Sequence, residues 1–148
     1  MKKIYPLSIL FIILDIITKQ IILNTMVEHQ SISVIKNFFS ITFAKNTGVA
    51  FSFLEGHVPI ITIMTILVII VILKYIQNTT LNKLETISYS LVLGGAIGNL
   101  IDRIIFGYVI DFLDFNIFGY SFPIFNLADT MIVIGIFTLL FLNIKESR

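Results

Sequence analysis

The residues best suited to chemistry lie between positions 94 and 129, in a chain that is otherwise rich in apolar residues. Ionisable side chains are costly at membrane depth, and they usually have a functional reason there. We single out the carboxylates of Asp111 and Asp129 as a candidate catalytic pair. The stretch holds four aspartates, three asparagines and one arginine: Asp102, Asp111, Asp114, Asp129, Asn99, Asn116, Asn126 and Arg103.

Two carboxylates that face each other do not both ionise easily, so one pKa rises and the pair holds a shared proton. One member can then activate water while the other protonates the leaving amine, which is the chemistry of aspartic proteases. Neighbouring asparagines can hydrogen-bond a peptide carbonyl without adding charge. The 18-residue spacing of Asp111 and Asp129 in the sequence does not give the distance between their carboxylates. Buried acids also line the pathways of ions through membrane proteins. A small transporter or ion-pathway subunit therefore stays open as the alternative.

The composition indicates an integral membrane protein of one domain, residues 1–148. Of the 148 residues, 57% are hydrophobic and only 13% are charged, whereas a soluble domain carries roughly 25% charged residues. A net charge of +1 argues against nucleic acid as a partner. The absence of cysteine excludes disulfides and thiolate catalysis. With two histidines and no HExxH motif, we expect neither a metal nor another cofactor.

Four apolar runs are long enough to cross a membrane as helices. In the first run, Asp15 and Lys19 are four residues apart and share a helix face. They form either a structural ion pair or the border of a polar cavity. In the third run, Gly94, Gly95 and Gly98 favour close helix packing over room for a ligand. The predicted helices cover about 6–23, 57–75, 85–103 and 124–144.

The two remaining segments, 24–56 and 104–123, are predicted to be outer loops. Alternating polar and apolar residues at 31–34 and 39–43 indicate strands, and hence a small sheet at one membrane surface. The sheet is followed by Asn46, Thr47 and Gly48, a turn signal that could also deliver the Asn46 amide to a site. The aromatic residues of 104–123 are typical of the membrane–water interface, so we expect this second loop to lie over the site. Asp114 and Asn116 are interpreted as ordinary loop residues.

The distribution of basic residues predicts that both termini are cytoplasmic. The polar residues of both loops and of the adjoining helix ends would then converge near the extracytoplasmic surface. A transporter would spread its acids through the bilayer, and a non-enzymatic interaction protein would not explain the asparagine–aspartate motifs. The terminal side carries Lys2, Lys3, Lys74, Lys83, Lys145 and Arg148, against Lys36, Lys45 and Arg103 on the other side.

Five motifs, in order along nearly the whole chain, resemble those of the lipoprotein signal peptidases. This family, also called signal peptidase II, comprises membrane aspartic proteases of bacteria. The matching stretches are DIITK at 15–19, NTGVAFS at 46–52, GGAIGNLIDR at 94–103, VIDF at 109–112 and FPIFNLAD at 122–129.

The resemblance implies a monomeric endopeptidase of the bacterial cytoplasmic membrane that needs no cofactor. Its substrate would be a prolipoprotein already modified with diacylglyceryl, cleaved to release the signal peptide. Asp111 and Asp129 match the catalytic aspartates. Asp102 lies in a family motif and has a rival claim to catalysis, but we expect it to hold Arg103 and the helix end in place. The supporting and substrate-contacting positions are Asn46, Gly48, Asn99, Arg103, Asn126, Asp15 and Lys19.

Overall fold

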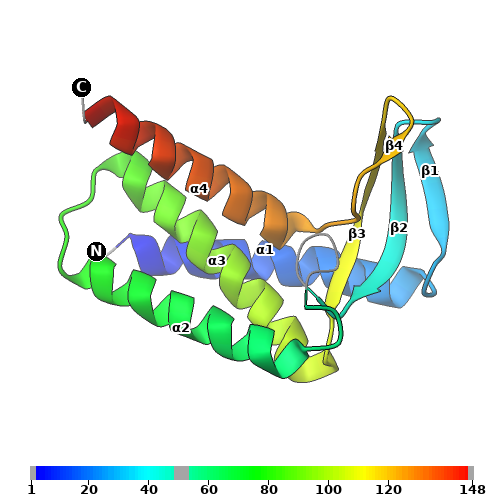
Figure 1. Cartoon of the computed structure of the whole chain (residues 1–148), viewed down its shortest axis with the longest axis horizontal. Helices are drawn as coiled ribbons and strands as arrows, with labels where there is room; N and C mark the ends of the chain where they lie inside the picture. Colours follow the sequence, from blue (N-terminus) through cyan, green and yellow to red (C-terminus); the bar gives the residue numbers. More distant parts are fainter. Residues whose placement is uncertain (1–2, 49–53, 147–148) are drawn as a thin grey trace.

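The computed structural model describes residues 3–48 and 54–146 and confirms the predicted fold class. It is mainly helical, with a small antiparallel sheet at one end (Figure 1). Each helix begins and ends within a few residues of its predicted range. The elements in order are α1 (Ile4–Thr25), β1 (Ser31–Ile35), β2 (Phe39–Asn46), α2 (Val58–Gln77), α3 (Lys83–Phe106), β3 (Val109–Ile117), β4 (Tyr120–Ser121) and α4 (Leu127–Glu146).

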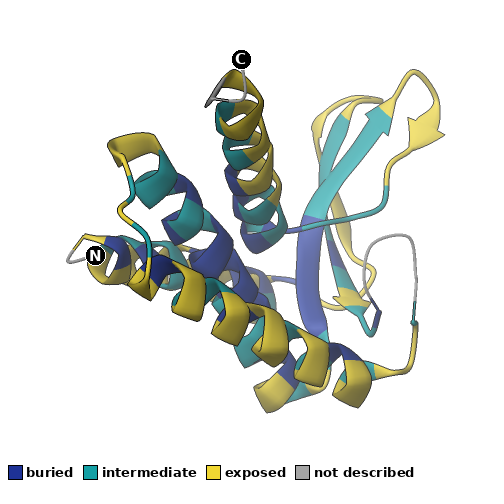
Figure 2. Cartoon of the chain, turned by 60° about the vertical axis from the view of Figure 1, so that its left-hand side comes forward, coloured by how far each residue is buried: buried dark blue, intermediate teal, exposed yellow. Residues whose placement is uncertain are grey.

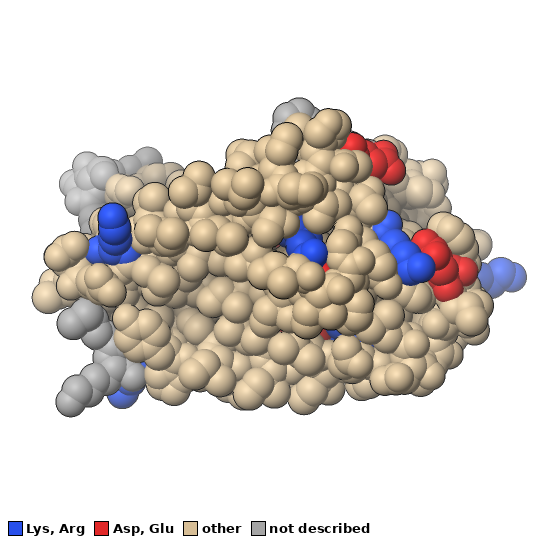
Figure 3. All heavy atoms as spheres, turned by 90° about the horizontal axis from the view of Figure 1, so that it is seen from below, with Lys and Arg blue, Asp and Glu red and all other residues tan. Residues whose placement is uncertain are grey.

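All four helices are long and apolar enough to cross a membrane. At about 1.5 Å per residue, a helix of about 20 residues spans the roughly 30 Å hydrocarbon core of a bilayer. Their outward faces are largely exposed and apolar (Figure 2). On the face shown in Figure 3, a broad stretch without charged side chains separates the basic groups at one end from the charges toward the sheet. This distribution fits helices surrounded by lipid.

Helix α3 is central and contacts each of the other three helices. Its glycines allow this close packing, because a Cβ on Gly95 would collide with the carbonyl oxygen of Ala128 in α4. A Cβ on Gly98 would likewise collide with the carboxylate of Asp15 in α1. These glycines therefore serve packing, as predicted. The helix ends at Gly107, whose φ of 77° is the left-handed conformation that favours glycine at this position.

The segment 104–123 was predicted to be a separate loop, and this prediction is wrong. The segment supplies β3 and β4 to the same sheet as β1 and β2. The strand order is β1-β2-β3-β4, with antiparallel pairing throughout. We interpreted the aromatic residues as a sign of an interfacial loop, but aromatic and branched side chains in alternation also favour strands.

Asp114 and Asn116 are likewise strand residues with structural hydrogen bonds, and the prediction of ordinary loop residues was wrong. The Asp114 carboxylate accepts a hydrogen bond from the Thr42 hydroxyl on β2 at 2.7 Å. The Asn116 side-chain oxygen accepts one from the Gly119 N–H at 3.0 Å. Both bonds support the sheet: one ties β3 to β2, and the other closes the turn between β3 and β4.

The sheet lies across one end of the helices, while both chain termini lie at the other end (Figure 1). It is anchored by an apolar cluster in which Ile22 of α1 and Met26, the residue that follows α1, pack with Phe43, Ile110 and Phe112. Burial is deepest along α3, at the start of α4 and in the first half of β3 (Figure 2). The strand β3 thereby carries its polar residue Asp111 to the junction of α3 and α4.

Candidate active site

Asp111 is buried on β3, where two asparagine amides hold its carboxylate. The Asn126 amide donates to Oδ1 at 2.7 Å, and the Asn46 amide donates to Oδ2 at 2.8 Å. Asn46 is the last residue of β2 and pairs with Val109 on β3. Its side chain therefore lies diagonally across the ladder from Asp111. Sheet pairing thus brings together two residues that are far apart in the sequence.

Asp129 lies in the first turn of α4 and helps to begin that helix. Its N–H donates to the Asn126 side-chain oxygen at 2.8 Å, and its carboxylate accepts from the Asn126 N–H at 3.3 Å. This reciprocal pair has the form of a capping box. The other carboxylate oxygen accepts from the Asn99 amide of α3 at 2.7 Å. A carboxylate is also favoured here by the positive end of the helix dipole.

Asn126 connects the two acids and is itself completely buried. Its amide nitrogen donates both to Asp111 and, at 3.1 Å, to the side-chain oxygen of Asn99. Asn99 in turn donates to Asp129. Since both asparagines are neutral, they orient the two carboxylates without adding charge. The result is one continuous network of acids and amides at the ends of α3, α4 and β3.

The surroundings of Asp111 raise its pKa and so favour the protonated form of its carboxyl group. Burial raises the pKa of its carboxyl to about 7, and the nearby negative charge of Asp129 contributes to the rise. The hydrogen bonds from Asn46 and Asn126, and the charge of Lys19, act in the opposite direction. An acid with a pKa near the working pH is suited to both accepting and donating a proton.

Lys19 is buried between two carboxylates beneath this network. Its ammonium lies 2.7 Å from Asp15 and 2.8 Å from Asp102, and it donates to the Asn99 side-chain oxygen at 2.8 Å. It is only 1% exposed. Asp15 and Lys19 therefore form an ion pair, one of the two alternatives that their spacing left open, and the contact of Lys19 with Asn99 joins that pair to the network of Asp111 and Asp129.

Asp102 was expected to hold Arg103, but it pairs with other groups. Its carboxylate forms an ion pair with Lys19 and accepts a hydrogen bond from the Ile110 N–H of β3 at 3.1 Å. Among the described residues, no ion pair joins Asp102 to Arg103. Consecutive residues on a helix do not face each other, so the two side chains point to different neighbours.

Arg103 instead reaches Gly48, the third residue of the motif that begins at Asn46. Its guanidinium donates to the Gly48 carbonyl at 3.1 Å, and the Gly48 N–H donates to the Asn46 side-chain oxygen at 2.8 Å. Residues 49–52 of this motif lie outside the described residues. Asn46 thus bonds Asp111 directly, and Gly48 and Arg103 are joined to Asp111 through Asn46.

The structure also shows two backbone donors that sequence reasoning missed. The Ala128 N–H donates to Asp15 at 3.0 Å, and the Ile110 N–H donates to Asp102. Both residues stand next to a candidate catalytic aspartate, so the Lys19 cluster is tied directly to the segments that position Asp111 and Asp129. Any residue type except proline can donate a backbone N–H, so the residue types at 110 and 128 do not indicate these hydrogen bonds. Only their positions next to Asp111 and Asp129 could have suggested the contacts.

A family model, curated relatives and solved structures each match this protein over nearly the whole chain. The family model described as signal peptidase II matches residues 7–145. The lipoprotein signal peptidase of Staphylococcus haemolyticus is 42% identical, covering 100% of this chain and 98% of the relative. That of Halothermothrix orenii is 41% identical, covering 89% and 88%. One solved bacterial membrane enzyme superposes with a TM-score of 0.91 at 36% identity, covering 99% of this chain and 90% of that enzyme. A second superposes with a TM-score of 0.87 at 37% identity, covering 98% of this chain and 94% of that enzyme.

Proposed function

The chain belongs to the signal peptidase II family, and we propose that Asp111 and Asp129 carry out its reaction. It is a membrane protease that removes the signal peptide from bacterial prolipoproteins. The observation that carries the residue assignment is the buried junction in which Asn126 bonds both acids and Asn99 bonds Asp129. Asp111 is buried and Asp129 is half-buried. Two carboxylates held in one such network are suited to share a single proton.

With one proton on the pair, each carboxyl group has a separate task. The ionised member takes a proton from a water molecule as its oxygen attacks the carbonyl carbon of the scissile bond. The protonated member donates to the carbonyl oxygen, producing a tetrahedral intermediate. When this intermediate collapses, the carbon–nitrogen bond breaks, and the carboxyl group that took a proton from water gives it to the leaving amine. The other carboxylate takes a proton from a hydroxyl of the intermediate, which restores the single shared proton. The amides of Asn46, Asn99 and Asn126 keep the two carboxylates oriented throughout.

The position of the site suits a substrate that is itself embedded in the membrane. Asp111 belongs to β3 and Asp129 to the first turn of α4. These two segments meet at the end of the molecule opposite the chain termini (Figure 1). We assign the termini to the cytoplasm because basic residues are concentrated on their side. The scissile bond of a signal peptide then meets the pair at the extracytoplasmic surface, and a diacylglyceryl group on its cysteine stays in the lipid. One chain supplies both acids and their partners, which supports a monomeric enzyme.

Incubation of the purified protein with a diacylglyceryl-modified prolipoprotein tests this function. We expect release of the intact signal peptide, cleaved immediately before the modified cysteine, as measured by mass spectrometry. The same prolipoprotein without the lipid is the matched control and should be cleaved much more slowly. If no signal peptide is released from the modified substrate by folded protein, the proposed function is wrong.

A further inference from the structure

The end of the sheet farthest from the catalytic junction exposes an unusual set of large apolar side chains. We define it as the sheet tip, residues 35–39 and 115–122, where the turns of the two hairpins lie together. The strand register pairs Phe39 with Phe115, and the Asn116 N–H donates to the Phe38 carbonyl at 2.9 Å. Phe118 is fully exposed, at 105%, and Tyr120 is 60% exposed. Exposed aromatic residues gathered in this way mark an interaction surface.

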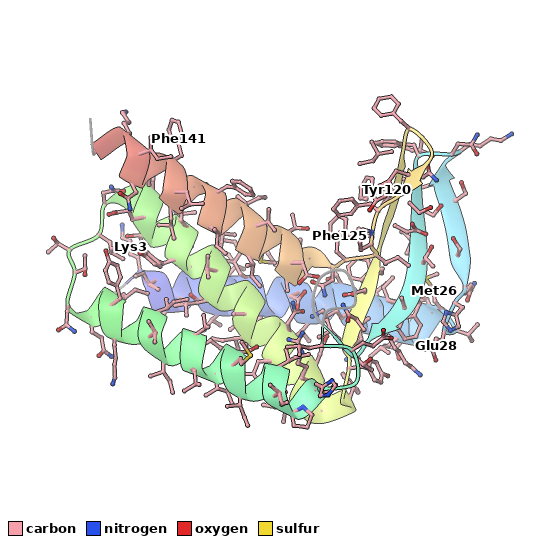
Figure 4. All side chains as sticks on the ribbon, in the orientation of Figure 1. Lys3, Met26, Glu28, Tyr120, Phe125 and Phe141 are labelled. Carbon is pink, nitrogen blue, oxygen red and sulfur yellow. The ribbon has the colours of Figure 1, made fainter. Side chains whose placement is uncertain are left out.

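A row of aromatic rings connects the sheet tip to the start of α4. Phe39 stacks on Phe115 with ring centroids 4.6 Å apart, and Phe115 stacks on Phe125 at 5.7 Å. Phe125 lies between the sheet and α4 (Figure 4), two positions before the first residue of that helix. Beside this row is a hollow of about 250 Å³ lined by Phe115, Ile117, Phe122 and Phe125. The apolar surface of the sheet tip therefore continues that of the membrane helix.

The direction of the strands brings this surface over the bilayer. The strands run across the direction of the helices, and the β3–β4 hairpin projects beside α4 (Figure 1). If the helices cross the membrane, the strands lie along its surface, and the rings beside Phe125 face the lipid around α4. This is the level at which aromatic side chains concentrate in membrane proteins.

The two ends of the sheet also differ in their charged residues. Lys36 is the only charged residue of the sheet tip. At the opposite end, Glu28 and Lys45 form an exposed ion pair at 2.8 Å, which indicates contact with water. Glu28 and Tyr120 lie toward these opposite ends in Figure 4. A surface of exposed aromatic residues with one cation and no acid matches the interface of a bilayer that contains anionic lipid.

We propose that the sheet tip inserts into the phospholipid interface of the bilayer and anchors the sheet there. The anchor is on the same strand as Asp111, so it holds β3 at a constant depth relative to the membrane. The occupant of the aromatic surface is the bilayer itself, in continuity with the lipid around α4. This proposal does not depend on the catalytic assignment.

Reaction of single cysteines with a charged, membrane-impermeant maleimide tests the anchor. The natural chain has no cysteine, so only the introduced thiol reacts. Phe118→Cys reports on the sheet tip, and His29→Cys is the matched control, since the His29 side chain is 84% exposed near the opposite end of the sheet. Both variants are placed in vesicles of phosphatidylcholine and phosphatidylglycerol at low protein content. Each rate is divided by the rate for the same variant unfolded in sodium dodecyl sulfate.

Insertion predicts that the Phe118→Cys variant reacts about tenfold or more slowly than the His29→Cys variant, because lipid excludes the reagent and disfavours the reactive thiolate. Tyr120→Cys should be similarly slow. Comparable reaction rates for the Phe118→Cys and His29→Cys variants would overturn the proposal. Protection of the thiol at position 118 that grows with protein concentration at fixed lipid would also overturn it, because it would indicate that a second copy of the chain covers the sheet tip.

An independent measurement uses the absence of tryptophan from the chain. The emission of Phe118→Trp should shift to the blue in vesicles and lose intensity when the phosphatidylcholine is brominated near the carbonyl end of its acyl chains. His29→Trp should show neither change. Emission from Phe118→Trp that matches this control would contradict insertion.

Discussion

Replacing Asp111 or Asp129 by asparagine should reduce the rate of signal peptide release by about 10³-fold or more. Asparagine has nearly the same shape as aspartate and keeps one side-chain oxygen that can accept a hydrogen bond. It cannot, however, take a proton from water or return one to the leaving amine. Because the mechanism uses both carboxyl groups in the same step, either single substitution should be sufficient. The measurement is the initial rate on a diacylglyceryl-modified prolipoprotein, divided by the amount of folded protein.

Asp114→Asn is the matched control for this prediction. Asp114 is on the same strand as Asp111 but bonds the Thr42 hydroxyl within the sheet. The control should cleave at nearly the natural rate, and all variants should show cooperative thermal unfolding. Natural activity in folded Asp111→Asn or Asp129→Asn protein would exclude the assigned pair. Asp102→Asn tests the rival assignment, and we expect this variant to lose stability rather than all catalysis, because Asp102 bonds Lys19 and the backbone of Ile110.

Replacing Lys19 by methionine should lower the free energy of unfolding by about 3–5 kcal/mol, the usual cost of removing one partner from a buried ion pair. Methionine fills similar space, so the effect isolates the charge. Without the ammonium, the carboxylates of Asp15 and Asp102 remain buried together, and the Asn99 side-chain oxygen loses a donor. The measurement is denaturant-induced unfolding in a mild detergent.

Two comparisons separate lost charge from lost packing. Lys45→Met removes a cation from the exposed pair with Glu28 and should change stability little. Adding Asp102→Asn to Lys19→Met should restore part of the lost stability, because one uncompensated acid is then neutral. If Lys19→Met unfolds like the natural protein, the buried cluster does not stabilise the fold. If the double variant is less stable than Lys19→Met, uncompensated charge is not the cause.

The features that could be predicted from the sequence depend on local patterns. Long apolar runs located the four helices, and the spacing of Asp15 and Lys19 placed them on one helix face. The bond between Asn46 and Asp111 depends on the register of β2 with β3, which no local pattern specifies. The loop prediction for 104–123 failed because aromatic residues are favoured both at interfaces and in strands.

The interpretation of Asp102 failed for a related reason. Its neighbour in the sequence, Arg103, offered an obvious partner, whereas its actual partner Lys19 lies on another helix. Helix geometry directs adjacent side chains apart, so only the packing of α1 against α3 could identify the contact. The contact matters for the site because Lys19 also bonds Asn99, which holds Asp129.

If Asp111 and Asp129 act as a pair with one shared proton, kcat/KM of the purified protein must depend on pH at both ends of the range. Above the raised pKa of Asp111, about 7, the pair loses its proton and no acid remains to protonate the carbonyl oxygen of the scissile bond. At low pH both members are protonated, and neither can activate water. We therefore expect a bell-shaped profile of kcat/KM whose alkaline limb is centred near pH 7. Activity that stays constant as the pH rises through this region, with the protein folded, would contradict it.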